Sequence, residues 1–231
     1  MTYTFFLIDA CLFVLPFFLA IDRKHFQVEI IRSAVVPALI QAIFFSEIAV
    51  FFVQSKVWSI SPAYTLGFGY RSLPLEVYLL VFALGFTGIS AYNYLNLRFP
   101  DNTFQKYSLA VSNLMIGFFI AIGYAGHRFW FPMVTVAAVI ILLLIVEYVS
   151  RLRFMYRFYR VFFIMLAPSF FVFGILANYQ VLTYNAKETL GFKLVNAPVE
   201  TAFYLMGILL LGVYLLENFK NREKKNGTSS L

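Results

Sequence analysis

Long apolar runs separated by short polar segments dominate this chain. A helix that spans the hydrocarbon core of a bilayer needs about 20 predominantly apolar residues, and seven segments qualify. The first run lacks the basic flank and the small-residue cleavage site of a signal peptide, so we interpret it as a spanning helix. The polar segment from Asn218 predicts a disordered tail. The seven predicted spanning helices cover residues 3–20, 33–53, 74–96, 107–126, 129–149, 161–180 and 198–217.

The composition agrees with an all-α integral membrane protein. Hydrophobic residues make up 61% of the 231 positions, charged residues make up 13%, and the mean hydropathy is +0.81. A soluble domain carries about 25% charged residues. Cys11 is the single cysteine, and His25 and His127 both lie near loops, which excludes a disulfide framework, a cysteine-based metal site and a His-rich di-iron site. The sequence has no phosphate loop, dinucleotide fingerprint or serine-nucleophile motif, so we expect no metal and no cofactor.

The net charge of +7 indicates membrane topology rather than nucleic-acid binding. Of the 18 Lys and Arg residues, 13 follow the odd-numbered predicted helices and five lie on the opposite side. The positive-inside rule then predicts an amino terminus outside and a carboxyl terminus in the cytoplasm. The 13 are Arg23, Lys24, Arg32, Arg98, Lys106, Arg151, Arg153, Arg157, Arg160, Lys220, Arg222, Lys224 and Lys225.

The chain contains an internal repeat. The tetrapeptide TLGF at 65–68 recurs at 189–192, and Pro74 and Glu76 recur as Pro198 and Glu200, always 124 residues later. Four predicted helices separate the two copies, so the copies run in the same direction. We therefore predict a 3+1+3 parallel repeat with pseudo-twofold symmetry about the membrane normal. Its parts are a first repeat over 1–96, a linker helix over 97–128, a second repeat over 129–217 and a basic cytoplasmic tail over 218–231.

Glu76 and Glu200 are the strongest candidate functional residues. Ser72 and Asn196 precede them at the same spacing and are predicted N-caps, which puts Pro74 and Pro198 in the first helical turn and the acids at its end. Duplicated helix caps are one explanation of this pattern. An ionisable group in a spanning helix is costly, however, and usually faces a functional interior. We predict that both carboxylates enter one shared cavity near the outer end of the bundle.

Two further acids and several aromatic residues lie near this level. Asp9 lies in the first half of the first predicted helix and Glu47 lies near the middle of the second, and neither has an acidic counterpart 124 residues later. Glu47 either contributes to the site or pairs with a buried polar group. Aromatic side chains can stabilise a cation through their π faces, and those near the carboxylates are Trp58, Tyr64, Tyr78, Phe203 and Tyr204. The predicted substrate contacts are Pro74, Pro198, Tyr78, Phe203, Tyr204 and Glu47.

Segments spread along the chain carry a family resemblance. They are YTFFLID at 3–9, DRK at 22–24, the loop 58–70, LPLE at 73–76, TLGF at 189–192, PVE at 198–200 and FY at 203–204. Together they resemble the membrane lycopene cyclases, which are heterodimeric in some bacteria and occur as a fused domain in fungal phytoene synthase–lycopene cyclases. The resemblance covers nearly the whole chain. In that family Pro-x-Glu is commonly followed by a second acid, whereas this chain has Val77 and Thr201 at those positions.

The resemblance implies an isomerase that forms β-ionone-type rings from the ψ-end groups of lycopene or a related carotenoid. Glu76 and Glu200 would supply the acid and the base without a redox cofactor. It also implies a bacterial cytoplasmic membrane, contact with membrane lipid, and a homo-oligomer or an association with other carotenoid enzymes. Two alternatives remain open, namely a diverged, inactive member of the family and a small-molecule transporter of the SWEET type. The hinges of such a transporter would lie at the helix prolines Pro16, Pro37, Pro132 and Pro168. The apolar, aromatic-rich helices nevertheless fit a lipid-like ligand better than a sugar.

Overall fold

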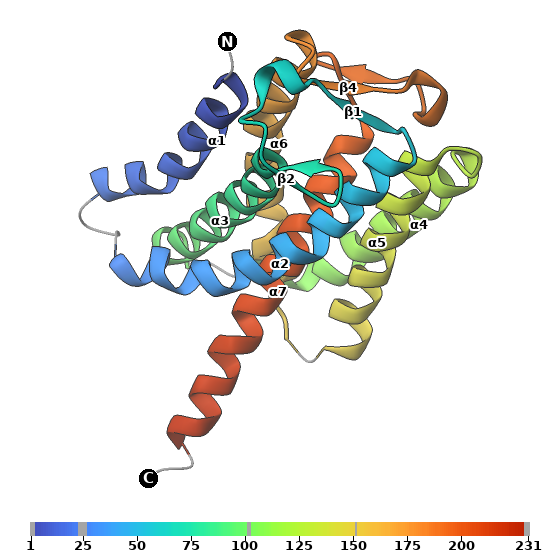
Figure 1. Ribbon diagram of the computed structural model, residues 1–231. Coiled ribbons are helices and arrows are strands. Elements are labelled where there is room, and N and C mark those ends of the chain that lie inside the picture. Colours follow the sequence, from blue (N-terminus) through green and yellow to red (C-terminus); the bar gives the residue numbers. More distant parts are fainter. Residues whose placement is uncertain (1–2, 23–26, 101–102, 151, 229–231) are drawn as a thin grey trace.

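A computed structural model describes residues 3–22, 27–100, 103–150 and 152–228, and shows a bundle of helices with short strands at one end (Figure 1). Each of the seven predicted helical segments is present in the described residues. The first is shorter than predicted, because it is α-helical only over Thr4–Val14 and continues as a 3₁₀ helix to Ile21. The α-helices are α1 (Thr4–Val14), α2 (Val28–Gln54), α3 (Leu75–Arg98), α4 (Ser108–Ala125), α5 (Trp130–Leu144), α6 (Met155–Asn178) and α7 (Glu200–Thr228).

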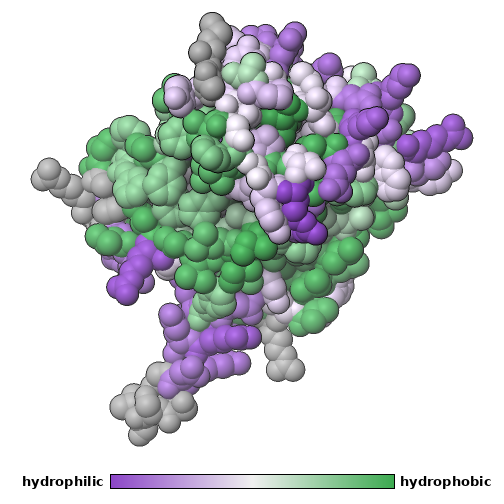
Figure 2. All heavy atoms as spheres, in the orientation of Figure 1, coloured by the Kyte–Doolittle hydropathy of each residue, from purple (hydrophilic) through white to green (hydrophobic). Residues whose placement is uncertain are grey.

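Six of these helices are long and apolar enough to cross a bilayer, and the first apolar helix, Thr4–Leu19, falls short of that length. Helices α3 and α7 form the centre, since α3 packs against α1, α2, α6 and α7, and α7 also contacts α2, α5 and α6. Buried residues make up 72% of the apolar window of α3 but only 11% of that of α4, which lies outside against α5. Hydrophobic side chains cover the sides of the bundle, and hydrophilic ones gather at its ends (Figure 2). The chain is an integral membrane protein.

Three two-stranded antiparallel ribbons depart from the predicted all-α class. In two of them a strand pairs with its neighbour in the chain, β2 (Gly69–Tyr70) with β3 (Leu73–Pro74) and β5 (Lys193–Leu194) with β6 (Ala197–Pro198). The third joins segments far apart in sequence, β1 (Trp58–Ile60) and β4 (Leu182–Tyr184). These strands lie at the end of the bundle where α1 begins, and α7 projects from the opposite end (Figure 1).

The repeated sequence adopts the same local backbone twice. The described non-glycine residues with positive φ form pairs 124 residues apart, and the two positive-φ glycines, Gly67 and Gly191, form another. The β1–β4 ribbon has matching symmetry, because its central pair, Ser59 and Thr183, is also separated by 124 positions. The non-glycine pairs are Lys56 and Gln180, Arg71 and Val195, and Ser72 and Asn196.

The prediction that Ser72 and Asn196 cap helices is wrong. Both lie in two-residue hairpin turns in which both central residues have positive φ, 49° and 69° for Arg71–Ser72 and 50° and 64° for Val195–Asn196. This is the pattern of a type I′ turn, whose twist suits adjoining strands. Pro74 therefore ends a strand and occupies the N-cap position of α3 with an extended backbone.

Two other predictions concern the ends of segments. The tail predicted to be disordered from Asn218 is helical as far as Thr228, because α7 continues without a break past the apolar span. Helix α6 begins at Met155 rather than 161, so it includes the basic residues Arg157 and Arg160. His25, Arg23, Lys24 and Arg151 lie outside the described residues.

Candidate functional site

Glu76 and Glu200 begin α3 and α7 and are both fully buried, with 0% exposure. In each copy the carboxylate Oε1 accepts a hydrogen bond of 2.5 Å from a loop amide, that of Leu66 for Glu76 and that of Leu190 for Glu200. The other carboxylate oxygen, Oε2, has no hydrogen-bond partner among the described residues in either copy. Each acid is thus oriented by the loop of its own copy and keeps one oxygen available for chemistry.

The local sequence explains how the loop reaches the acid. Gly67 and Gly191 have φ of 81° and 84°, a left-handed conformation that glycine adopts without a steric penalty. The residue after each glycine, Phe68 or Phe192, comes before the hairpin, and its carbonyl accepts a backbone hydrogen bond of 3.0 Å from the residue just before the glutamate. This folds the loop back over the first helical turn, where the amide before the glycine meets the carboxylate.

Asp9 brings a second acid to the first copy. Its side chain on α1 is only 3% exposed, and neither of its carboxylate oxygens has a hydrogen-bond partner within the described chain. It lies close enough to Glu76 for the two groups to interact electrostatically. Helix α1 is held against α3 by the Thr87 hydroxyl, which donates to the Leu12 carbonyl at 2.9 Å. The first-copy site therefore contains two buried carboxyl groups.

Glu200 lies instead beside a cluster of aromatic side chains. It interacts electrostatically with Tyr184 in β4, and burial raises the pKa of that phenol, which keeps it neutral. Trp58 packs edge-on against Tyr184 and Tyr204, with ring centroids 6.3 and 5.4 Å apart, and Phe131 stacks on Tyr184 at 5.9 Å. The Trp58 Nε1 and the Tyr184 hydroxyl both lack hydrogen-bond partners in the part of the chain described.

The two copies thus share a backbone and differ in side-chain chemistry. The first-copy counterparts of Tyr184 and Tyr204 are Ile60 and Leu80, which are aliphatic. The second-copy counterpart of Asp9 is Met133, whose side chain is uncharged and partly exposed. One carboxylate has an acidic neighbour and the other has aromatic neighbours.

The other predicted contact residues have varied surroundings. Tyr204 is buried and its hydroxyl donates to the Phe45 carbonyl of α2 at 2.7 Å. Phe203 is buried on the other side of α7 and packs against Phe119 of α4, with ring centroids 5.3 Å apart. The half-buried Tyr78 donates to the Tyr70 carbonyl at 3.1 Å. Pro74 is half-buried and Pro198 is buried, each two residues before a carboxylate.

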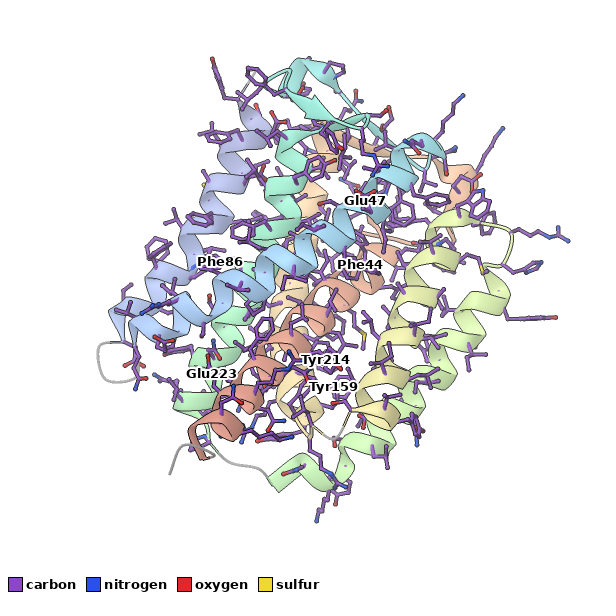
Figure 3. All side chains as sticks on the ribbon, turned by 60° about the horizontal axis from the view of Figure 1, so that its bottom comes forward. Phe44, Glu47, Phe86, Tyr159, Tyr214 and Glu223 are labelled. Atoms are coloured by element: carbon purple, nitrogen blue, oxygen red, sulfur yellow. The ribbon has the colours of Figure 1, made fainter. Side chains whose placement is uncertain are left out.

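Glu47 is less deeply placed than predicted. It lies on the outer face of α2 (Figure 3), its side chain is 51% exposed, and Arg71 Nη1 donates to both of its oxygens, at 3.0 and 2.8 Å. Of the two alternatives for Glu47, a site residue or the partner of a buried polar group, the second is not what the structure shows, because its partner is an exposed arginine in the β2–β3 turn. The structure joins Glu47 to the surface of the first hairpin, and its contact with substrate stays a prediction.

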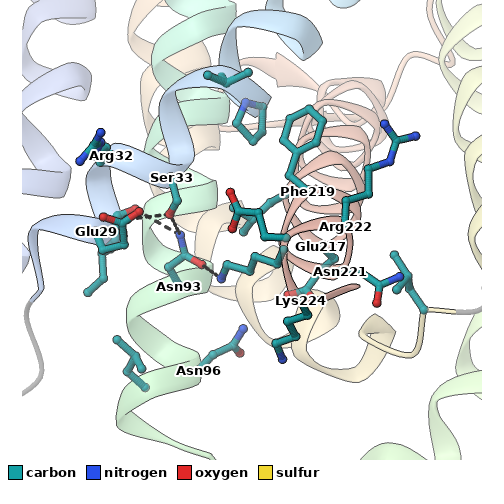
Figure 4. Close-up of a pocket in the computed structure, with 18 of the residues that line it drawn as sticks. Glu29, Arg32, Ser33, Asn93, Asn96, Glu217, Phe219, Asn221, Arg222 and Lys224 are labelled. Atoms are coloured by element: carbon teal, nitrogen blue, oxygen red, sulfur yellow. Dashed lines mark hydrogen bonds between the residues drawn. The ribbon is translucent and has the colours of Figure 1, made fainter. Parts of the chain in front are cut away.

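Two cavities among the described residues stand out, and neither is lined by Glu76, Glu200 or Asp9. The larger, about 1200 Å³, lies among α2, α3 and α7 at the end opposite the strands (Figure 4). Within it, the Lys220 ammonium donates to the Asn93 side chain at 2.6 Å, and Asn93 donates to the Ser33 hydroxyl at 3.0 Å. The smaller, about 430 Å³, lies beside the end of α6 and β4. The predicted shared cavity of the two glutamates therefore remains a prediction.

A family model described as lycopene cyclase matches residues 1–95 and 128–219. The chain belongs to the lycopene cyclase family. No curated protein and no solved structure matches it. The buried acids among the described residues of this lycopene cyclase family member, Asp9, Glu76 and Glu200, fall within the matched segments, and α4 falls in the unmatched segment between the two. The resemblance read from the sequence is confirmed, and membership favours carotenoid cyclisation over transport.

Sequence reasoning missed two neighbours of the carboxylates. Asp9 had been noted as deeply placed, but its approach to Glu76 depends on the packing of α1 against α3, across more than 60 intervening residues. Tyr184 reaches Glu200 through the β1–β4 pairing, and a three-residue strand has too short a pattern to recognise in advance.

Proposed function

We propose that this protein cyclises the ψ-end groups of lycopene or a related carotenoid, using Glu76 and Glu200 for the proton transfers. The observation that carries this proposal is a duplicated, fully buried carboxyl group with one oxygen left without a partner in each copy. Structural carboxylates inside membrane helices are costly and are normally paired. Acid–base chemistry explains why both copies keep theirs.

The reaction needs only proton transfers and a stabilised cation. A carboxylic acid protonates the terminal double bond, the neighbouring double bond attacks the resulting tertiary cation, and a carboxylate removes a proton to leave the β-ionone-type ring. Substrate and product have the same formula, so no electrons are exchanged. The aromatic cluster beside Glu200 supports this chemistry, because π faces stabilise cations in a site that excludes water. The remaining contact residues of the proposal are Pro74, Pro198, Tyr78, Phe203, Tyr204 and Glu47.

The architecture we propose for this reaction is the 3+1+3 parallel repeat, with the amino terminus outside and the carboxyl terminus in the cytoplasm of a bacterial membrane. The paired positive-φ residues and the symmetric β1–β4 register support a twofold relation between the copies. The excess of Lys and Arg after the odd-numbered helices supports the orientation. In this arrangement both carboxylates lie at the same depth near the outer surface. Substrate enters from the membrane lipid, and self-association or association with another carotenoid enzyme passes it on.

The test is expression in bacteria that accumulate lycopene, followed by chromatographic analysis of the pigments. We expect ring-containing carotenoids with the wild-type chain, and strongly reduced ring formation with Glu76→Gln and with Glu200→Gln at equal membrane abundance. General acid–base catalysis contributes about 10²–10⁴-fold, so the loss would be visible in pigment composition. Unchanged cyclisation by both variants would refute the assignment of the residues.

Absence of any cyclised pigment with the wild-type chain would instead favour the diverged, inactive family member. Val77 and Thr201 directly follow the two glutamates and are each 2% exposed. The double variant Val77→Glu with Thr201→Asp would then show whether restoring the second acids restores the activity.

A further inference from the structure

Asp9 is a buried acid whose burial no structural interaction explains. Its side chain is 3% exposed, and both of its oxygens lack hydrogen-bond partners among the described residues. Two polar side chains that are similarly buried in the bundle do have partners: Thr87 donates to the Leu12 carbonyl, and Asn93 donates to the Ile30 carbonyl and to the Ser33 hydroxyl. Burying a polar group without a hydrogen bond costs roughly 1–3 kcal/mol in proteins. A residue retained only for packing would be apolar here.

Glu76, the acid with which Asp9 interacts, also has an oxygen without a hydrogen-bond partner among the described residues. Glu76 uses Oε1 to accept the Leu66 amide, and its Oε2 is unpartnered. Asp9 and Glu76 interact electrostatically, and neither forms an ion pair with a cation of the described residues. Two carboxyl groups close together in an apolar interior are costly to ionise at the same time, because like charges repel each other and no water screens them. One proton shared between two such groups relieves that cost.

We propose that Asp9 is a further catalytic residue, which shares one proton with Glu76 and forms with it the acid that protonates the ψ-end group. This rests on the proposed function. The O–H bond of the pair breaks as a C–H bond forms at the terminal double bond, and the ring closes with the π electrons of the next one. The ring C–H bond then breaks and its proton passes to the Glu200 carboxylate. Between turnovers Glu200 releases that proton to water and the pair takes one up, so atoms and charge balance.

The activity test compares Asp9→Asn and Asp9→Glu with a matched control, Asp22→Asn, in the lycopene-accumulating host. Asp22 also belongs to the amino-terminal segment, but its carboxylate bonds to Tyr94 and Arg98 away from Glu76. We expect Asp9→Asn to lower ring formation by about 10²-fold or more, Asp9→Glu to restore part of it, and Asp22→Asn to retain it. Ring formation by Asp9→Asn at the wild-type rate would overturn the proposal.

Two measurements on purified protein do not depend on cyclisation. A protonated carboxylic acid has a carbonyl stretch in the infrared that ionised carboxylates lack, and we expect Asp9→Asn to remove or shift such a band while Asp22→Asn leaves it unchanged. Asp9→Leu, which removes an unpartnered polar group, should unfold at the same temperature as wild type or higher and yet form no rings. An unaltered infrared band in Asp9→Asn would refute the proposal that Asp9 shares a proton with Glu76, whatever the activity of the wild type. Ring formation by Asp9→Leu would refute it as well. Wild-type protein that shows the band but forms no rings would overturn the proposed function and the catalytic role of Asp9, and leave the proton pair intact.

Discussion

Replacing Glu200 separately by Gln and by Ala distinguishes its chemical role from its structural one. The Leu190 amide donates to Glu200 Oε1, and this bond orients the loop over the start of α7. Glutamine retains a side-chain oxygen that can accept this bond, but it cannot carry the exchangeable acidic proton. Alanine loses both the acid and the acceptor, and leaves the Leu190 amide without its partner. The two variants should therefore be equally inactive and differ in stability.

The structure sets the size of the difference. Hydrogen bonds to charged groups contribute about 1.5–3 kcal/mol, and a buried donor left unpaired costs about 1–3 kcal/mol. We expect Glu200→Ala to lower the free energy of unfolding by about 2 kcal/mol relative to Glu200→Gln, and the matched pair at Glu76, which accepts the Leu66 amide, to behave alike. Thermal unfolding in detergent micelles measures stability, and pigment analysis measures activity.

Three outcomes would contradict this reasoning. Equal stability of the Gln and Ala variants would mean that the loop is held by other contacts. Active Gln variants would mean that the carboxyl groups are helix-start residues without a catalytic role. A large stability loss at one site and none at the other would contradict the equivalence of the two copies.

Two further predictions concern residues around the carboxylates. Tyr204→Phe removes the hydroxyl that donates to the Phe45 carbonyl and should lower the free energy of unfolding by about 1 kcal/mol. Tyr184→Phe removes a hydroxyl without a partner among the described residues and should leave the free energy of unfolding unchanged in the same thermal assay. A larger loss for Tyr184→Phe than for Tyr204→Phe would contradict the assigned contacts. Gly67→Ala and Gly191→Ala, at φ of 81° and 84°, should each destabilise by about 1 kcal/mol and by equal amounts, and a difference larger than the measurement error would show that the two loops are not equivalent.

The sequence predicted what depends on long patterns and missed what depends on contacts. Apolar runs of about 20 residues identified the six described helices that are long enough to cross a bilayer, because the bilayer requires that length. The hairpin turns were misread as caps because Ser72 and Asn196 suit both, and only their positive φ decides. The inclusion of Arg157 in α6 also went unpredicted, since a basic residue at a membrane boundary is compatible with helix or loop. The placement of Asp9 beside Glu76 required the packing of α1 on α3.

The difference between the two copies matters more for the proposed reaction than their likeness. A ring-forming reaction needs an acid at one point and a base with cation-stabilising walls at another, and two identical carboxylate sites would supply the same group twice. The backbone of the repeat keeps Glu76 and Glu200 in equivalent positions. Asp9 then gives the first an acidic neighbour, and Tyr184, with the rings packed on it, gives the second an aromatic surface. Environments that differ around equivalent carboxyl groups are a general way to divide acid and base roles.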